Sequence, residues 1–238
     1  MSSFSREELI RYSRQMMLPE IGLKGQEKIK VAKILVVGAG GLGCPILQYL
    51  SAAGVGTIGI IDFDKIELHN LHRQILYSTE DVGKPKATIA GEKLKKQNPH
   101  TAFMIFDEML TETNAEKIIS QFEIIVDGSD NFLTRYLVND TCVKLKLPVL
   151  YGSILKFEGQ FAVFNYNGGK NLRDLFPEPP NPEDVPNCDE NGVMGTLPAI
   201  IASMMAHETL KLILKIDAIH NQLVIFDTAN WNYSKVDY

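Results

Sequence analysis

A run of closely spaced glycines, Gly38-Ala-Gly-Gly-Leu-Gly43, comes directly after an apolar stretch at residues 33–37. Glycines at this spacing let the backbone turn tightly and bring its N–H groups against phosphate oxygens at the positive end of a helix. Asp62 ends the next apolar stretch, 19 positions beyond Gly43, and a carboxylate there can hold the ribose hydroxyls of a nucleotide. These residues predict a nucleotide with an adenosine half, and on their own they fit NAD.

The segment after Asp62 concentrates side chains that could act on a triphosphate. Asn70, Arg73 and Gln74 follow the carboxyl end of a predicted strand, where open α/β sheets bind ligands, and Lys86 begins a predicted helix. A dehydrogenase only holds a pyrophosphate, whereas an enzyme that displaces pyrophosphate must stabilise the charge growing on it, as Arg and Lys do. A solvated surface charge is the simpler interpretation of a single Lys, but it explains the cluster less well.

A third polar group, Val126-Asp-Gly-Ser-Asp-Asn131, ends another apolar run. Asp130 is placed to bind Mg²⁺, which would bridge phosphate groups. The alternative is a structural cap, because Asp and Asn are favoured at helix N-termini. Both roles are compatible if Asp127 or Ser129 caps the helix while Asp130 reaches the ligand.

The N-terminal segment carries a further set of polar residues. Ser5 opens a predicted helix at residues 5–18, which places Arg11 and Gln15 on one face with Arg14 one step round. A plain polar helix face is the alternative interpretation.

Strands and helices that alternate along the chain must position these groups. The apolar runs that predict strands lie at residues 33–37, 57–61, 102–106, 124–126 and 148–151. Helices are predicted at residues 42–53, 84–97, 112–121 and 131–146. Strands that are apolar throughout and alternate with helices predict an α/β, Rossmann-like fold, with a largely parallel sheet covered by helices on both faces.

The pattern changes after residue 152. Runs at residues 157–164, 223–226 and 231–236 predict an antiparallel C-terminal extension, and a long helix at about 197–215 opens at Thr196 with Pro198 in its first turn. Five of the eleven prolines fall between Pro177 and Pro186, which argues against helix or central strand there. We therefore predict a functional crossover loop at about residues 165–195, within a single domain over residues 1–238.

The amino-acid composition indicates a soluble globular protein. The 238 residues are 45% hydrophobic and 22% charged with a formal charge of −5, which predicts one soluble α/β domain with no nucleic-acid partner. No apolar run approaches the roughly 18 residues of a membrane span, and the N-terminus is polar where a signal peptide is apolar. Three widely spaced cysteines make no disulfide framework. We predict a cytoplasmic protein without a membrane partner.

Five motifs together resemble the MoeB/ThiF/HesA family, the bacterial relatives of ubiquitin-activating enzymes. They are RYSRQ, GAGGLG, DFDKIELHNLHRQ, GKPK and DGSDN, in the family's order. The resemblance covers about residues 5–230. It implies a homodimer in which each subunit uses ATP to adenylate the C-terminal carboxylate of a ubiquitin-like sulfur-carrier protein ending in Gly-Gly.

The resemblance also implies roles for individual residues. The residues carried over to ATP binding are Gly38, Gly40, Gly41, Gly43, Asp62, Asn70, Arg73, Gln74, Lys86, Asp130 and Asn131. Asp62 would hold the ribose, Arg73 and Lys86 would act on the triphosphate, and Asp130 would hold Mg²⁺. Arg14 would enter the site of the partner subunit. A sulfur donor such as a cysteine desulfurase would then form a thiocarboxylate, for thiamin or molybdopterin synthesis.

The cysteines depart from the family's pattern. Many members hold zinc with two Cys-x-x-Cys pairs, and here the first pair is replaced by Asn171-Leu-Arg-Asp174, so no zinc is expected. Cys188, in the predicted loop, resembles in position a cysteine that some ThiF-like proteins join to the activated carrier. The alternative is an incidental thiol, because the acidic residues that follow it disfavour a thiolate.

Three other functions remain open at this point. An NAD(P)-dependent oxidoreductase leaves Arg73, Lys86 and Asp130 without a role. A non-catalytic carrier-binding scaffold would fit the lost zinc cysteines but predicts degraded ATP motifs. An activator of a peptide C-terminus would use the same chemistry on another substrate.

Overall fold

Strands form where runs of Ile, Val, Leu and Phe are bounded by glycine, proline or polar residues. The chain is described here by a computed structural model, which covers residues 4–180 and 192–238. The strands are β1 (Lys33–Val37), β2 (Thr57–Ile61), β3 (Ala102–Phe106), β4 (Ile124–Asp127), β5 (Val149–Leu155), β6 (Glu158–Phe164), β7 (Gln222–Asp227) and β8 (Asn232–Asp237).

All of these strands belong to one sheet in the order β3-β2-β1-β4-β5-β6-β7-β8. The first five are parallel, and β6, β7 and β8 are antiparallel to their neighbours. Val37 at the end of β1 pairs with Ile61 on one side and with Asp127 on the other. The chain winds outward from β1 to β3 and then returns to β4, so the strand order switches direction between β1 and β4. The predicted Rossmann-like fold with an antiparallel extension is confirmed.

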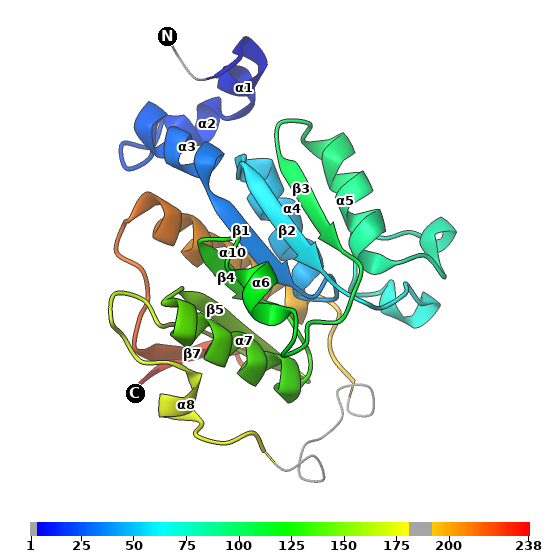
Figure 1. The fold of residues 1–238 in the computed structure, drawn as a ribbon, viewed down its shortest axis with the longest axis vertical. Coiled ribbons are helices and arrows are strands. Elements are labelled where there is room, and N and C mark those ends of the chain that lie inside the picture. The colour runs from blue at the N-terminus through cyan, green and yellow to red at the C-terminus, as the bar shows by residue number, and fades with distance from the viewer. Residues whose placement is uncertain (1–3, 181–191) are drawn as a thin grey trace.

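Helices cover both faces of the sheet (Figure 1). The helices longer than one turn in the described residues are α1 (Arg6–Arg11), α3 (Gly22–Val31), α4 (Gly43–Ala53), α5 (Lys86–Gln97), α6 (Ala115–Ile119), α7 (Phe132–Leu145) and α10 (Leu197–Leu214). Shorter elements are α2 (Ser13–Met16), η1 (Leu68–Asn70), η2 (Thr79–Asp81) and α8 (Leu172–Leu175). One apolar cluster joins the sheet to α4, α5 and α10, and a second joins it to α6 and α7.

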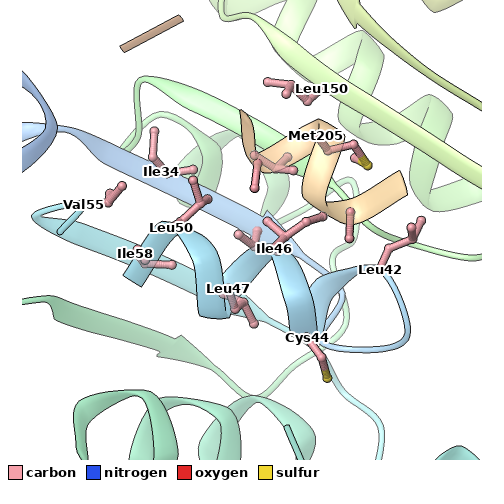
Figure 2. Packing of buried hydrophobic residues seen from close by; sticks show 14 of the residues in the cluster. Ile34, Leu42, Cys44, Ile46, Leu47, Leu50, Val55, Ile58, Leu150 and Met205 are labelled. Atoms are coloured by element: carbon pink, nitrogen blue, oxygen red, sulfur yellow. The ribbon is translucent and has the colours of Figure 1, made fainter. Parts of the chain in front are cut away.

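Strand β1 illustrates why these strands are apolar throughout. Ile34 and Val36 face the cluster with α4 and α10, whereas Leu35 and Val37 face the cluster with α6 and α7. Figure 2 shows the first cluster, in which α4 packs beside α10 and Met205 of α10 also lies against β5 of the sheet. Each buried side chain of this size contributes about 1.5–3 kcal/mol to folding. Both faces of β1 are therefore core, which fixes the glycine loop at its end.

Two cysteines belong to these clusters. Cys44, at the start of α4 in Figure 2, and Cys142, on α7, are fully buried. Burial raises the pKa of the Cys44 thiol to about 12 and also raises the pKa of Cys142. Both thiols therefore remain protonated at neutral pH, as expected of core residues.

The N-terminal helix differs from its prediction. Ser5 caps α1 as expected, but the predicted single helix is interrupted at Tyr12. The Tyr12 ring lies against Gly54, where an added Cβ would be 2.5 Å from the ring, and its hydroxyl accepts a hydrogen bond from Asn98 Nδ2 at 2.9 Å. The prediction of one continuous helix is wrong because Tyr12 is held by this tertiary contact.

Helix α10 contradicts the expectation that no segment of the chain is long and apolar enough to span a membrane. Over Leu197–Leu214 its length and composition would allow it to cross a membrane, and 56% of it is buried inside the fold. It packs on α3, α4, β5 and β6, and Thr196 and Pro198 begin it as predicted. We therefore assign it as a core helix. Helix α3, which was not predicted, is held to it by Lys28, whose Nζ donates to the carbonyl of Leu214 at 2.9 Å.

The start of the predicted crossover loop is attached to α7. Arg173 of α8 pairs with Asp140 of α7, with Nε 2.8 Å from Oδ1 and Nη2 2.8 Å from Oδ2. The Tyr136 hydroxyl lies 2.9 Å from the carbonyl oxygen of Phe176 and 2.8 Å from that of Glu178. Polar contacts to α7 thus hold residues 172–178.

Candidate active site

A pocket of about 560 Å³ opens at the carboxyl ends of the parallel strands, at β1 and β4, between which the strand order changes direction. This switch point is where open α/β sheets bind ligands, and the volume suits a nucleotide-sized molecule. Among the predicted ATP residues, those that line it are Gly38, Gly40, Gly41, Asp62, Arg73, Gln74, Lys86, Asp130 and Asn131. Gly43 and Asn70 do not line it, and both support residues that do.

The glycine loop is fixed by the end of β2. Asp62 is buried, and its carboxylate accepts hydrogen bonds from the backbone N–H groups of Ala39 at 2.7 Å and Asp64 at 2.8 Å. Burial raises the pKa of Asp62. A Cβ at Gly43 would lie 2.0 Å from the carbonyl oxygen of Gly38, so this glycine allows the loop to fold onto α4. Asp62 therefore shapes the loop in addition to facing the pocket.

Arg73 and Gln74 lie beside the glycine loop. The Arg73 stem passes Gly41, with Cδ 3.6 Å from a Cβ built there, and its Nη1 donates to the carbonyl of His69 at 3.3 Å. Gln74 is buried, and its Oε1 has no hydrogen-bond partner among the described residues. Asn70 braces this turn, since its carbonyl accepts the N–H groups of both residues. The turn thus presents one cation and one unpaired amide oxygen.

Lys86 starts α5 and projects into the pocket from the β2 side. It is buried, and its Nζ lies 2.9 Å from Asp64 Oδ2. A second bond, from the Lys86 N–H to the Asp64 carbonyl, also measures 2.9 Å. Asp64 was not singled out from the sequence, although it lies two residues beyond Asp62. This ion pair holds the ammonium in place.

The segment after β4 forms the opposite side of the pocket. Asn131 caps α7 by accepting from the Thr134 N–H at 2.9 Å, so the expectation that Asp127 or Ser129 is the cap is wrong. Asp127 instead accepts the Ser129 N–H at 2.9 Å, and burial raises its pKa. Asp130 is exposed at the pocket and makes no hydrogen bond or ion pair to another described residue. Its carboxylate is therefore available to a ligand.

Arg135 is a pocket residue that the sequence analysis missed. It is buried in the first turn of α7, and its Nε and Nη2 donate to the Ser129 carbonyl at 3.3 and 2.9 Å. Its position four residues after Asn131, one helical turn along, was the available signal.

Helix α2, which contains Arg14, lies with α1 and α3 near the N-terminus, at the end of β1 opposite its carboxyl end (Figure 1). Gln15, the neighbour of Arg14, donates to the Ala53 carbonyl at 2.8 Å, at the C-terminal end of α4. The glycine loop is at the N-terminal end of that 11-residue helix, about 16 Å away. Arg14 is exposed, and Met17 Sδ, 3.9 Å from Nη1, is its hydrogen-bond partner. Arg14 therefore lies outside the pocket of its own chain.

Two further predictions concern sulfur and metal. Cys188 lies outside the described residues. Within residues 4–180 and 192–238, no group of three or more His, Cys, Asp or Glu side chains is arranged to hold a metal ion.

A model of the ThiF family matches residues 12–238. The chain belongs to the ThiF family. Its sequence is 48% identical to the sulfur carrier protein adenylyltransferase of Thermus thermophilus, over 98% of this chain and 88% of that protein. It is 45% identical to the probable adenylyltransferase/sulfurtransferase MoeZ of Mycobacterium tuberculosis, over 99% of this chain and 61% of that protein. The adenylyltransferase and sulfurtransferase MOCS3 of Culex quinquefasciatus is 47% identical, over 95% and 52%.

These relatives confirm the predicted class of enzyme, a nucleotidyltransferase. The ThiF chain spans 61% and 52% of the lengths of MoeZ and MOCS3. Solved structures support the fold. PaaA superposes with a TM-score of 0.84 at 21% identity, covering 100% of this chain and 75% of that one. Escherichia coli MccB with MccA-N7isoASN also gives 0.84, at 22% identity, covering 99% and 73%.

Proposed function

We propose that this chain transfers AMP from ATP to the C-terminal carboxylate of a ubiquitin-like sulfur-carrier protein ending in Gly-Gly. The observation that carries the proposal is the gathering of the glycine loop, Asp62, Arg73, Lys86 and Asp130 around one pocket at the β1–β4 switch point. Similarity along almost the whole length of a sulfur carrier protein adenylyltransferase supports the choice of substrate. An NAD(P)-dependent oxidoreductase would leave the two cations and Asp130 without a role.

In the proposed reaction, an oxygen of the carrier carboxylate forms a bond to the α-phosphorus of ATP. The bond from that phosphorus to the bridging oxygen of pyrophosphate breaks, and pyrophosphate leaves with the electron pair. The carboxylate is ionised at neutral pH, so no protein base has to remove a proton. The chain contributes position and charge: the glycine loop orients phosphate through its N–H groups, and Arg73 and Lys86 stabilise the leaving group.

Magnesium fits the residues at this pocket. Asp130 is an exposed carboxylate that makes no hydrogen bond or ion pair to the residues the structure describes, and Mg²⁺ is commonly held by one or two carboxylates together with substrate phosphates. When bound, the ion would offset phosphate charge. We continue to expect no zinc, which elemental analysis of the purified protein would check.

The proposal extends to the assembly and to sulfur transfer. We expect a homodimer in which Arg14 completes the phosphate site of the partner subunit, because Arg14 cannot reach its own. The outer sulfur of a persulfide on a donor such as a cysteine desulfurase would then attack the acyl-adenylate and release AMP, and a second thiol, for which Cys188 is a candidate, would cleave the resulting acyl disulfide, releasing the thiocarboxylate and forming a disulfide with the donor. Thiamin and molybdopterin synthesis are the two expected destinations.

ATP–pyrophosphate exchange tests the proposal. Candidate carriers ending in Gly-Gly from the same genome are added one at a time to enzyme, ATP, Mg²⁺ and labelled pyrophosphate. Exchange that depends on one carrier and on its terminal carboxylate is the expected result. Absence of exchange with every carrier, together with exchange driven by a short peptide, would favour activation of a peptide C-terminus instead.

A further inference from the structure

Arg135 is a buried cation that makes no direct ion pair with a described residue, although it is close enough to the buried Asp127 carboxylate to lower the pKa of that group against the effect of burial. Arg135 is 6% exposed and lines the pocket, yet no Asp or Glu of the described chain lies within 4.0 Å of its guanidinium. Three of its N–H groups are used, two on the Ser129 carbonyl and one on Ser153 Oγ at 3.1 Å. A guanidinium has five N–H donors, so two remain for a ligand.

The plane of this guanidinium is held by aromatic rings. The Phe132 and Tyr151 ring centroids each lie 5.3 Å from Arg135 Cζ, and the Tyr151 hydroxyl is fixed by Gln160 Nε2 at 3.0 Å. Ring faces attract a cation without neutralising its charge. A rigid, planar donor of this kind is suited to a carboxylate or a phosphate.

Ser129 provides an independent sign of a ligand at the same place. It is 8% exposed and lines the pocket, and its Oγ makes no well-aligned hydrogen bond to a described residue, although the hydroxyl is close enough to Asp127 to help lower the pKa of that carboxyl. Its N–H is bound to Asp127 and its carbonyl to Arg135, so only the hydroxyl is left to interact. A buried hydroxyl without a partner is unfavourable unless a ligand supplies one.

The order of the strands indicates which ligand Ser129 and Arg135 contact. Asp62 follows β2, the glycine loop follows β1, and Ser129 and Arg135 follow β4, with Ile154 and Leu155 of β5 lining the pocket beyond them. A nucleotide with its ribose at Asp62 and its phosphates on the glycine loop fills the β2–β1 half. The β4–β5 half combines an anion-binding pair with an apolar lining, which matches the carboxylate end of a peptide chain.

We propose that Arg135 and Ser129 bind the C-terminal carboxylate of the incoming carrier and orient it toward the α-phosphate. The inference rests on the proposed function and adds to it the residues that hold the nucleophile. One carboxylate oxygen accepts hydrogen bonds from Arg135 and Ser129 while the other forms the bond to phosphorus. Ser153 and Tyr151 act through Arg135 as positioning residues.

The test compares two forms of one carrier, with a C-terminal carboxylate and with a C-terminal carboxamide. Their dissociation constants are measured with a non-hydrolysable ATP analogue bound. Wild-type enzyme is expected to bind the carboxylate form about 10-fold or more tighter, the scale of a hydrogen bond to a charged group. In Arg135→Gln this ratio is expected to approach one, while affinity for the analogue changes by less than about two-fold.

Arg73→Gln is the matched control and should have the reverse effect. It should lower the affinity for the ATP analogue and leave the preference for the carboxylate form of the carrier unchanged. Ser129→Ala and Ser153→Ala should each reduce the preference for the carboxylate form several-fold. These two variants test the inference if Arg135→Gln does not fold. An unchanged preference in these variants, or an analogue affinity that falls in Arg135→Gln as far as in Arg73→Gln, overturns the inference. Lack of exchange by wild-type enzyme, which is a separate measurement, would instead reject the proposed function.

Discussion

The two sides of the pocket hold their charges in different ways. On the β2 side, Lys86 is paired with Asp64 at 2.9 Å, and Asp62 accepts two backbone N–H groups. On the β4 side, within residues 4–180 and 192–238, Asp130 makes no hydrogen bond or ion pair and Arg135 has no carboxylate within ion-pair distance. The carboxylates and the lysine of the β2 side are paired without ligand, with Gln74 Oε1 the open acceptor there, whereas on the β4 side the charged groups themselves have open donors and acceptors.

This difference indicates a division of labour. Groups that are already paired keep their geometry when the site is empty, so the β2 side is preorganised for nucleotide. Groups that lack partners gain most when a ligand arrives, because a buried or aligned charge is then compensated. The β4 side is therefore where metal and nucleophile are expected to add their binding energy.

The largest effect is expected from removing the cations near the leaving group. Lys86→Ala and Arg73→Ala should each lower carrier-dependent pyrophosphate exchange by about 10²-fold or more, the scale for one preorganised electrostatic contact. Asp64 is half-exposed, so water can solvate it after loss of Lys86 and the fold should survive, as circular dichroism would show. Lys84→Ala, an exposed lysine in the same segment, is the control. Near-normal exchange in both pocket variants would contradict the assignment.

A smaller effect is expected on the open side. Asp130→Asn should raise the Mg²⁺ concentration needed for half-maximal exchange by at least about 10-fold, because an amide is a weaker ligand than a carboxylate. Asp107→Asn, the same change on an exposed residue after β3 outside the pocket lining, should leave the Mg²⁺ requirement unchanged. An unaltered titration in Asp130→Asn would show that this carboxylate does not hold the ion.

Mixing variants tests whether the pocket is completed by a second copy. Arg14→Ala and Asp130→Ala subunits are each expected to be inactive, and equal mixing should restore about a quarter of wild-type activity, because half of the dimers are hybrids with one intact site each. Exchange kinetics after confirmed subunit exchange are the measurement. If activity is not restored, Arg14 acts in the site of its own chain or has no role in catalysis.

The smallest effect concerns the support of the β4 side. The hydrogen bond from Arg173 lowers the pKa of Asp140, so this pair stabilises the fold above the ordinary aspartate range and the contribution disappears as pH falls through the lowered pKa. Asp140→Asn should therefore lower the Tm slightly at neutral pH, and the difference from wild type should vanish in acid. A difference that stays constant down to about pH 2, well below an ordinary aspartate pKa, would mean that charge is not its source.

Much of the fold follows from local patterns. Strands β1, β2 and β3 begin and end at the predicted residues, since apolar runs buried on both faces have sharp polar or glycine boundaries. Helix α3 was missed because Gly22 and Gly25 weaken its propensity and its stability comes from packing on α10. The break at Tyr12 likewise depends on a residue 42 positions away, Gly54.

The candidate site shows the same limit. Glycines and polar residues that directly follow parallel strands lie close together, because the carboxyl ends of these strands share one edge of the sheet. The sequence alone is therefore enough to predict that such residues lie at that edge. Which groups are already paired depends on side-chain geometry. Asp64 and Arg135 were therefore overlooked, and Asn131 was assigned only to ATP although it also caps α7.

The contact of Tyr12 with Gly54 has a consequence for how this family can vary. Within the stretch Arg11–Gln15, Tyr12 and Gln15 anchor the segment to the end of α4, whereas Arg14 points to solvent. Two different constraints therefore act on this short motif. Tyr12 and Gln15 are constrained by packing inside the chain, whereas Arg14 is constrained by the molecule that it contacts. Position 54 also has a φ of +89°, so glycine is favoured there twice over. We expect positions 12 and 54 to coevolve, and position 14 to vary independently of both.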